Sequence, residues 1–289
     1  MLRRPRLAVT PLRSPRLRAL NQPRAAGKRW WALGLLSGSL LAVLVWPPAT
    51  WLARAVQSAT HGRLILAEAQ GTLWQGSALT VLAAGVGMRD AMVLPSRLHW
   101  RVAPFWGGLR LKLTQAGMLS GTLQLEWRPG WKQQQLAVLP DDGGSASGVV
   151  GRWPAGWLEG LGAPLNTLRP GGELQLSTQA LTLHSAGQGW QMQGQATLDL
   201  LQASSRIATV APLGSYRIRF SGPQGLGPVQ LSLATLEGAL QLSGSGQIDP
   251  QGLHLRGEAQ AAPGFEAALN NLLNIIGRRE GALSRISIG

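Results

Sequence analysis

Apolar and polar residues alternate along most of the chain after residue 60. In "YRIRF" (216–220), Tyr216, Ile218 and Phe220 fall on one side of an extended chain, and Arg217 and Arg219 fall on the other. The same alternation occurs in "LHWRV" (98–102), "LRLKL" (109–113), "MQGQATLDL" (192–200), "VQLSL" (229–233) and "LHLRGEA" (253–259). Because successive side chains of a strand point to opposite faces, this pattern predicts half-buried strands. Gly and Pro separate the segments as turns do, so we expect a mainly β protein with a large antiparallel sheet, either a sandwich or an open roll.

Near the C-terminus the apolar period changes from that of a strand to that of a helix. Within "PGFEAALNNLLNII" (263–276), one helical stripe contains Phe265, Ala268, Leu269, Leu272, Leu273 and Ile276. The stripe predicts a C-terminal helix that lies over an edge or open end of the sheet, where it would hide unpaired strand groups.

The segment "WWALGLLSGSLLAVLVWPPATWLA" (30–53) has no charged residue. As a helix, Trp30 to Trp46 would extend roughly 25 Å, close to the ~30 Å hydrocarbon core of a bilayer. Tryptophans stand at both ends of the segment, where the indole ring prefers the level of the lipid headgroups. We therefore predict a single transmembrane helix over residues 30–53. The alternative is a cleaved signal peptide, because Ala53, Arg54 and Ala55 form a small-x-small site; the long basic tail, the Pro-Pro pair and the tryptophans favour a retained anchor.

The charge of the chain is concentrated before this segment. The net charge is +14, and nine of the 27 basic residues precede Trp30 without any acidic residue among them. Basic residues on one side of the span predict a cytoplasmic tail, residues 1–29, and a β-rich domain, residues 54–289, across the membrane. The high isoelectric point therefore describes mainly a tail and not a nucleic-acid-binding face. Within the domain, "PDDGGSASG" (140–148) is a candidate linker between two sub-domains.

Residues that carry chemistry are scarce. The chain has no cysteine, and His61, His99, His184 and His254 lack the spacing of metal ligands. No G-x-S-x-G nucleophile elbow, phosphate-binding loop or complete dinucleotide fingerprint is present. The adjacent acids Asp141 and Asp142 fall in the candidate linker. We therefore expect no enzymatic activity, no catalytic residues, no cofactor and no metal.

The phrase "GTLWQGSA" (71–78) stands between two predicted strands. As local structure it predicts a hairpin corner, in which Gly71 and Gly76 provide backbone freedom and Trp74 provides buried aromatic area. The phrase is also one of several that resemble the type II secretion system protein N family of Gram-negative bacteria. The others, in the same order, are "LPSRLHWRVAP" (94–104), "LNTLRPGGELQL" (165–176), "APLGSYRIRFSG" (211–222), "LEGALQLSGSG" (236–246) and "LLNIIGRREGALSRISIG" (272–289).

The resemblance implies an accessory component of the bacterial inner membrane, which takes part in moving folded periplasmic proteins across the outer membrane. It implies a single-pass topology with the bulk of the chain in the periplasm, and partners among the inner-membrane and secretin-facing components of the system. It assigns no catalytic residues. Strand-rich periplasmic sheets behind one anchor also resemble AsmA-type lipid-handling proteins, so a groove for acyl chains is the alternative. A lipid groove requires an open apolar face, whereas a scaffold closes its core.

Overall fold

The computed structural model describes residues 31, 34–35, 37–39, 45–85, 90–130, 133–140, 147–163, 165–185, 190–223, 227–249 and 251–289. The chain divides into two units, residues 1–45 and Trp46–Gly289. The described residues of the first unit are helical. The described helices include none with both the length and the apolar character needed to cross a membrane. The predicted tail (1–29) and most of the predicted span lie outside the described residues.

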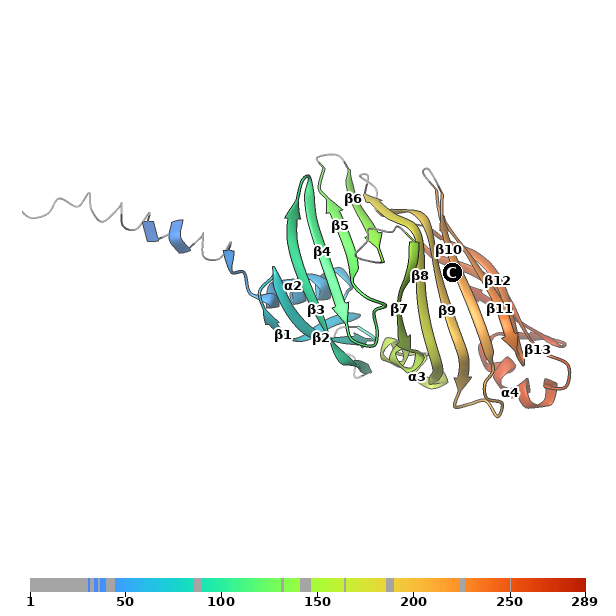
Figure 1. Cartoon of the computed structure of the whole chain (residues 1–289). Helices are drawn as coiled ribbons and strands as arrows, with labels where there is room; N and C mark the ends of the chain where they lie inside the picture. Colours follow the sequence, from blue (N-terminus) through green and yellow to red (C-terminus); the bar gives the residue numbers. More distant parts are fainter. Residues whose placement is uncertain are drawn as a thin grey trace, which may run out of the picture. The chain divides into compact units, whose positions relative to one another are not determined.

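A 15-stranded antiparallel sheet forms most of the second unit (Figure 1). Its strands are β1 (Leu64–Gly71), β2 (Gln75–Ala83), β3 (Ala91–Phe105), β4 (Gly108–Gln115), β5 (Leu123–Arg128), β6 (Gln134–Leu139), β7 (Ser147–Pro154), β8 (Pro170–Ser185), β9 (Trp190–Ser205), β10 (Gly214–Gly222), β11 (Val229–Gly238), β12 (Leu240–Asp249), β13 (Gly252–Ala261), β14 (Arg278–Glu280) and β15 (Leu283–Ile288). Neighbours in the sheet are mostly neighbours in the chain, and the path ends on different strands, β1 and β14. The sheet is therefore open, which agrees with the predicted open roll and not with a sandwich.

Each alternating segment quoted above lies in a strand. Pairing between strands keeps the apolar side chains on one face of the sheet and the polar side chains on the other. Tyr216 of β10 stands opposite Leu200 of β9, whereas Arg217 stands opposite Asp199 and Arg219 opposite Thr197. Tyr216 is buried and Arg219 is exposed. Because registered strands align their alternating side chains, the sheet has one apolar face and one polar face.

A helix packs on the apolar face at the β1 end of the sheet (Figure 1). Helix α2 (Ala49–Ala59) follows Pro48, which has an extended backbone and so ends any continuous helix from the preceding segment. The partly buried side chains of Leu52, Ala53 and Val56 pack with Leu66, Ala78 and Trp100. Residues 49–53 of the predicted span (30–53) therefore belong to this helix on the sheet.

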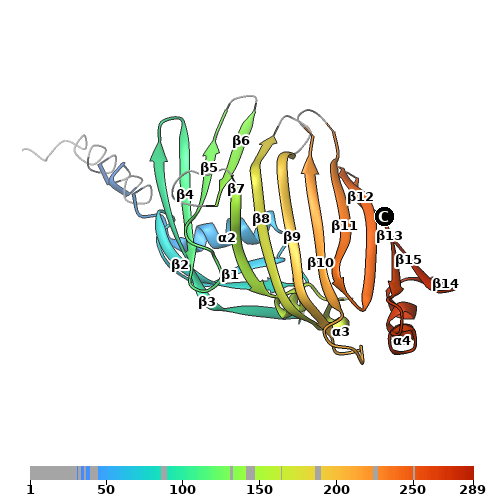
Figure 2. The same ribbon diagram turned by 45° about the vertical axis from the view of Figure 1, so that its right-hand side comes forward.

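The predicted C-terminal helix is confirmed as α4 (Glu266–Ile276), at the opposite end of the sheet (Figure 2). Leu269, Leu272 and Leu273 are buried against a cluster that includes Tyr216 and Leu240. Ile276 packs against the same cluster, whereas Phe265 and Ala268 of the predicted stripe are exposed.

The sheet continues across the predicted linker at 140–148. Residues 141–146 lie outside the described part of the chain, and Ser147 and Gly148 already belong to β7. Both flanking strands pair with β8: β6 with its residues 182–185, and β7 with its residues 173–179. After β7, a 3-10 helix η1 (Ala155–Leu161) packs on β2, β3 and β8, and a single helical turn α3 (Leu165–Leu168) leads into β8.

Candidate functional site

The corner between β1 and β2 needs both of its glycines. Gly71 has a positive φ of 89°, and a Cβ there would lie 2.5 Å from the carbonyl oxygen of Gln75. A Cβ at Gly76 would lie 2.5 Å from the Cζ2 atom of Trp100. The first glycine is required by backbone conformation and the second by close contact with an aromatic ring.

Two tryptophans meet this corner, and they have different roles. The carbonyl oxygen of Trp74 accepts a hydrogen bond from the N–H of Val102 at 2.7 Å, while its side chain is half-buried. Trp100 of β3 is only 2% exposed, and its Nε1 donates to the carbonyl oxygens of Thr72 and Leu73, each at 3.2 Å. The buried aromatic plug of the corner is thus Trp100, which the sequence signalled only by its place on the apolar side of "LHWRV".

The corner also holds the chain where the second unit begins. The N–H of Leu73 donates to the carbonyl oxygen of Pro47 at 2.8 Å, and Pro48 forms a β-bridge with Thr72. These contacts fix the two residues directly before α2. The "GTLWQGSA" segment is therefore a clamp on the chain at the start of the folded unit.

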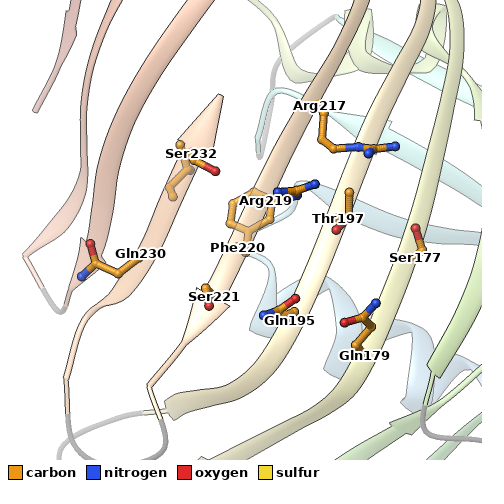
Figure 3. A pocket seen from close by; sticks show the side chains of 11 residues that line it. Ser177, Gln179, Gln195, Thr197, Arg217, Arg219, Phe220, Ser221, Gln230 and Ser232 are labelled. Carbon is orange, nitrogen blue, oxygen red and sulfur yellow. The ribbon is translucent and has the colours of Figure 1, made fainter. Parts of the chain in front are cut away.

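The polar face carries a hollow of about 580 Å³ over β8 to β11, which Figure 3 shows from close by. Hydroxyl, amide and guanidinium groups from neighbouring strands line it; its lining residues are Ser177, Gln179, Gln195, Thr197, Arg217, Arg219, Phe220, Ser221, Gln230, Leu231 and Ser232. Strand alternation explains the polar part of the lining, because every second residue of these strands projects to this face; Phe220 and Leu231 alternate with them and belong to the apolar face. Such a surface can bind a polar or anionic group through hydrogen bonds and charge.

Two arginines of the hollow differ in their partners. Arg217 donates from Nε and Nη2 to the two carboxylate oxygens of buried Asp199, at 2.7 and 2.8 Å. This hydrogen bonding raises the pKa of Arg217 above its ordinary value, against the opposing effect of burial. Arg219, in contrast, has no hydrogen-bond or ionic partner within the described part of the chain. The available positive charge of the hollow therefore comes from Arg219.

A second arginine–carboxylate group lies on the polar face, in the other half of the sheet. Buried Glu126 of β5 accepts from Nη2 of Arg110 at 2.6 Å and from Nη2 of Arg128 at 3.2 Å. Both guanidinium groups lie over the ring of Phe105, at 5.2 and 5.7 Å from its centre. Glu126 and Asp199 are thus both committed to ion pairs, and neither is placed to act as a general acid or base.

The histidines are spread over the unit. His99, His184 and His254 lie in β3, β8 and β13, and His61 lies in the turn after α2. Within the described ranges, no group of three or more His, Cys, Asp or Glu residues could hold a metal ion.

Comparison with known families decides the identity. The family model described as "Type II secretion system (T2SS), protein N" matches residues 62–285. The chain belongs to this family. The matched region begins just after α2 and includes the clamp, Trp100, the polar hollow and α4. No curated protein and no solved structure gives a significant match.

Membership in the type II secretion system protein N family makes the chain an accessory component of type II secretion. It also implies interactions with other components of the system. The predicted motif residues Gly71, Trp74 and Gly76 all lie in the clamp, between the first two strands of the sheet. The polar hollow was not predicted as a site; its only sequence signal was the Gln-, Ser- and Thr-rich side of the alternating strands.

Proposed function

We propose that the chain is a non-catalytic docking scaffold of the type II secretion system. Residues 30–46 hold it in the inner membrane, residues 1–29 face the cytoplasm and the sheet lies in the periplasm. The observation that carries the proposal is the open sheet, whose two edges are not equally available. Strand addition, in which a partner's strand pairs with an unpaired edge, is a common mode of docking.

The β1 edge is occupied by groups of the chain itself. Thr60 Oγ1 accepts from the N–H of Leu64 at 3.1 Å and donates to the carbonyl oxygen of Val56 at 2.8 Å. Nη2 of Arg97 donates to the carbonyl oxygen of Glu68 at 2.7 Å. A partner strand would have to displace these bonds, so this edge is the poorer docking site.

The opposite edge is partly free. β14 pairs only with residues 283–285 of β15, whereas β13 pairs with residues 283–288 on the other side. Residues 286–288 thus have no outer neighbour among the described strands. A strand from a secretion component that pairs here would lie beside β15, in line with β14.

Site-specific photo-crosslinking in the native membrane tests this proposal. A photo-reactive residue at Ser287 should capture a secretion component, and the same residue at Glu68 should capture none. Deletion of the gene should impair export of type II substrates. Normal export in the deletion strain, or equal capture of a secretion component at Ser287 and Glu68, would contradict the proposal.

The topology has its own test. A reporter active only in the periplasm should work when fused at Gly289 and fail when fused within residues 1–29. Recovery of a mature chain that starts near Arg54 would replace the anchor with a signal peptide.

One observation favours the alternative, a membrane-anchored lipid-binding protein. Ile218 and Phe220, on the apolar face, are partly exposed and belong to neither of the two packed clusters under α2 and α4. Ile248 and Leu253 near them are exposed. The full chain extracted in detergent would then carry phospholipid in fixed ratio, which mass analysis of bound lipid would detect. Lipid in fixed ratio without a secretion partner would favour this alternative over the scaffold.

A further inference from the structure

Trp106 occupies the tip of the hairpin between β3 and β4 and is fully exposed to solvent (100%). An indole ring normally buries a large apolar area, and an exposed one adds nothing to the core. Its position in a tight turn, followed by Gly107 with a positive φ, does not require an aromatic residue. Trp106 is thus placed to contact something outside the sheet.

Contacts of the preceding residue, Phe105, hold the hairpin rigid next to Trp106. The ring of Phe105, the preceding residue, lies under the guanidinium groups of Arg110 and Arg128. Both arginines are paired with the buried Glu126. Two cation–π contacts and an ion-pair network therefore hold the hairpin directly below its tip.

The tip lies at the end of the sheet where the clamp holds Pro47. Val102 of β3 is hydrogen-bonded to Trp74 of the clamp, and the neighbouring Leu73 holds Pro47. From Val102, β3 runs four more residues to Trp106, about 13 Å at ~3.3 Å per residue. Trp46, directly before Pro47, is itself 71% exposed. Two exposed indoles thus lie at the same end of the sheet.

We propose that Trp106 inserts into the headgroup layer of the periplasmic leaflet of the same bilayer that anchors the chain. The inference rests on the proposed function, since it needs residues 30–46 to lie in that membrane. The partner is a lipid surface because indole prefers the boundary between hydrocarbon and water, and because Trp46, at the end of the hydrophobic segment, is exposed at the same end of the sheet as this hairpin. With Trp46 as one contact and Trp106 as a second, the sheet cannot rotate freely about its anchor, and the β15 edge is held in a fixed orientation.

Lipid-mediated fluorescence quenching tests this contact. The full chain is placed in nanodiscs of phosphatidylethanolamine and phosphatidylglycerol that contain lipid with a nitroxide near its headgroup. Trp106→Phe should lower the quenched part of the tryptophan emission. Trp153→Phe is the control, since Trp153 is partly buried in β7, opposite Leu174 of β8, and should lie outside the headgroup layer. Unchanged quenching in Trp106→Phe, or equal losses in the two variants, would overturn the inference.

Two further measurements separate this inference from the proposed function. Alkaline extraction of membranes reports on the anchor: release of the wild-type chain would reject the proposed function, whereas a retained chain without Trp106 quenching rejects only the bilayer contact. A photo-reactive residue in place of Trp106, in intact cells, should form adducts with phospholipid. A reproducible protein adduct there would instead make Trp106 a protein-docking residue and overturn the bilayer contact.

Discussion

A helix packs on the apolar face at each end of the sheet, but the two helices are held in different ways. At the β13–β15 end, α4 contributes its own side chains to the core: Leu269 and Leu273 are fully buried and Leu272 is nearly so. At the β1–β4 end, Ala49 is the only residue of α2 that is buried, and Leu52, Ala53 and Val56 are partly exposed. The buried aromatic residue of that end, Trp100, belongs to the sheet.

The difference shows where each end gains its stability. Buried apolar area stabilises by about 25 cal/mol per Å², so α4 is attached mainly by its leucines. Side-chain hydrogen bonds add to this attachment, since Ser284 and Thr209 donate to the carbonyl oxygens of Leu273 and Ala268. α2 is instead fixed at its start, through Pro47 and the clamp around Trp100. α2 is thus tethered at its N-terminal end by the clamp and needs less burial of its own side chains.

The largest effect is expected for Trp100→Ala. Loss of this ring leaves a cavity under α2 and removes two hydrogen bonds to the clamp, so we expect a loss of about 3–5 kcal/mol in the free energy of unfolding. Denaturant titration of the full chain in detergent, followed by circular dichroism, measures it. Trp106→Ala is the control and should change stability by less than about 0.5 kcal/mol. Similar losses in both variants would contradict the assignment of Trp100 as the plug.

Leu273→Ala tests the other end. Because Leu273 is 0% exposed, its truncation should cost about 2–5 kcal/mol. Ile275→Ala, on the exposed side of the same helix (55%), should stay within about 0.5 kcal/mol of wild type. The same denaturant titration applies. A neutral Leu273→Ala would mean that α4 does not depend on its leucines.

Gly76→Ala tests whether the clamp tolerates a side chain. The added Cβ would collide with Trp100 and force the ring or the strand to shift, at a cost of about 1–3 kcal/mol. Gln75→Ala, at an exposed neighbouring position, is the control and should be nearly neutral. Thermal unfolding of both variants gives the comparison; a stable Gly76→Ala would show that the corner can relax.

Leu52→Ala sharpens the comparison between the two helices. Leu52 faces the sheet from α2 but is only partly buried, so its truncation should cost roughly 1–1.5 kcal/mol, about half the transfer free energy of a fully buried leucine. The expected loss is thus smaller than that of Leu273→Ala. An equal or larger loss, measured in the same titration, would remove the distinction between a tethered helix and a self-attached one.

The smallest effect is expected at Tyr216, the only tyrosine of the chain. Its hydroxyl donates to the carbonyl oxygen of Leu240 at 3.0 Å, so Tyr216→Phe should cost about 0.5–1.5 kcal/mol. Burial raises the pKa of Tyr216 well above its ordinary value. The unfolded chain ionises at pH ~10 while the folded chain stays neutral, so this residue lowers stability as the pH rises above ~10. Phenolate absorbance should appear only as the chain unfolds; its appearance in the folded chain would contradict the burial.

Particular residues show how far the sequence could be read. The alternation in "YRIRF" placed Tyr216 on the buried side and Arg217 and Arg219 on the other, because a strand has a fixed period of two. The stripe at 263–276 predicted α4 and its buried leucines for the same reason, with a period of 3.6. At 49–53, apolar content predicts part of a membrane span, whereas the structure places these residues in α2, because hydropathy does not distinguish lipid from the apolar face of a sheet. Pro48 was the local signal that a separate helix starts there.

The sequence by itself determined the strands, their two faces, the C-terminal helix and the family, since these depend on local periodicity and on the order of short phrases. Only the tertiary structure decided that Trp100, and not Trp74, fills the corner, that Asp199 neutralises Arg217 and leaves Arg219 available, and that β15 has a free edge. These features depend on which strands become neighbours and in which register. Pairing between residues far apart in the chain is set by the energy of the whole sheet, which no local pattern encodes.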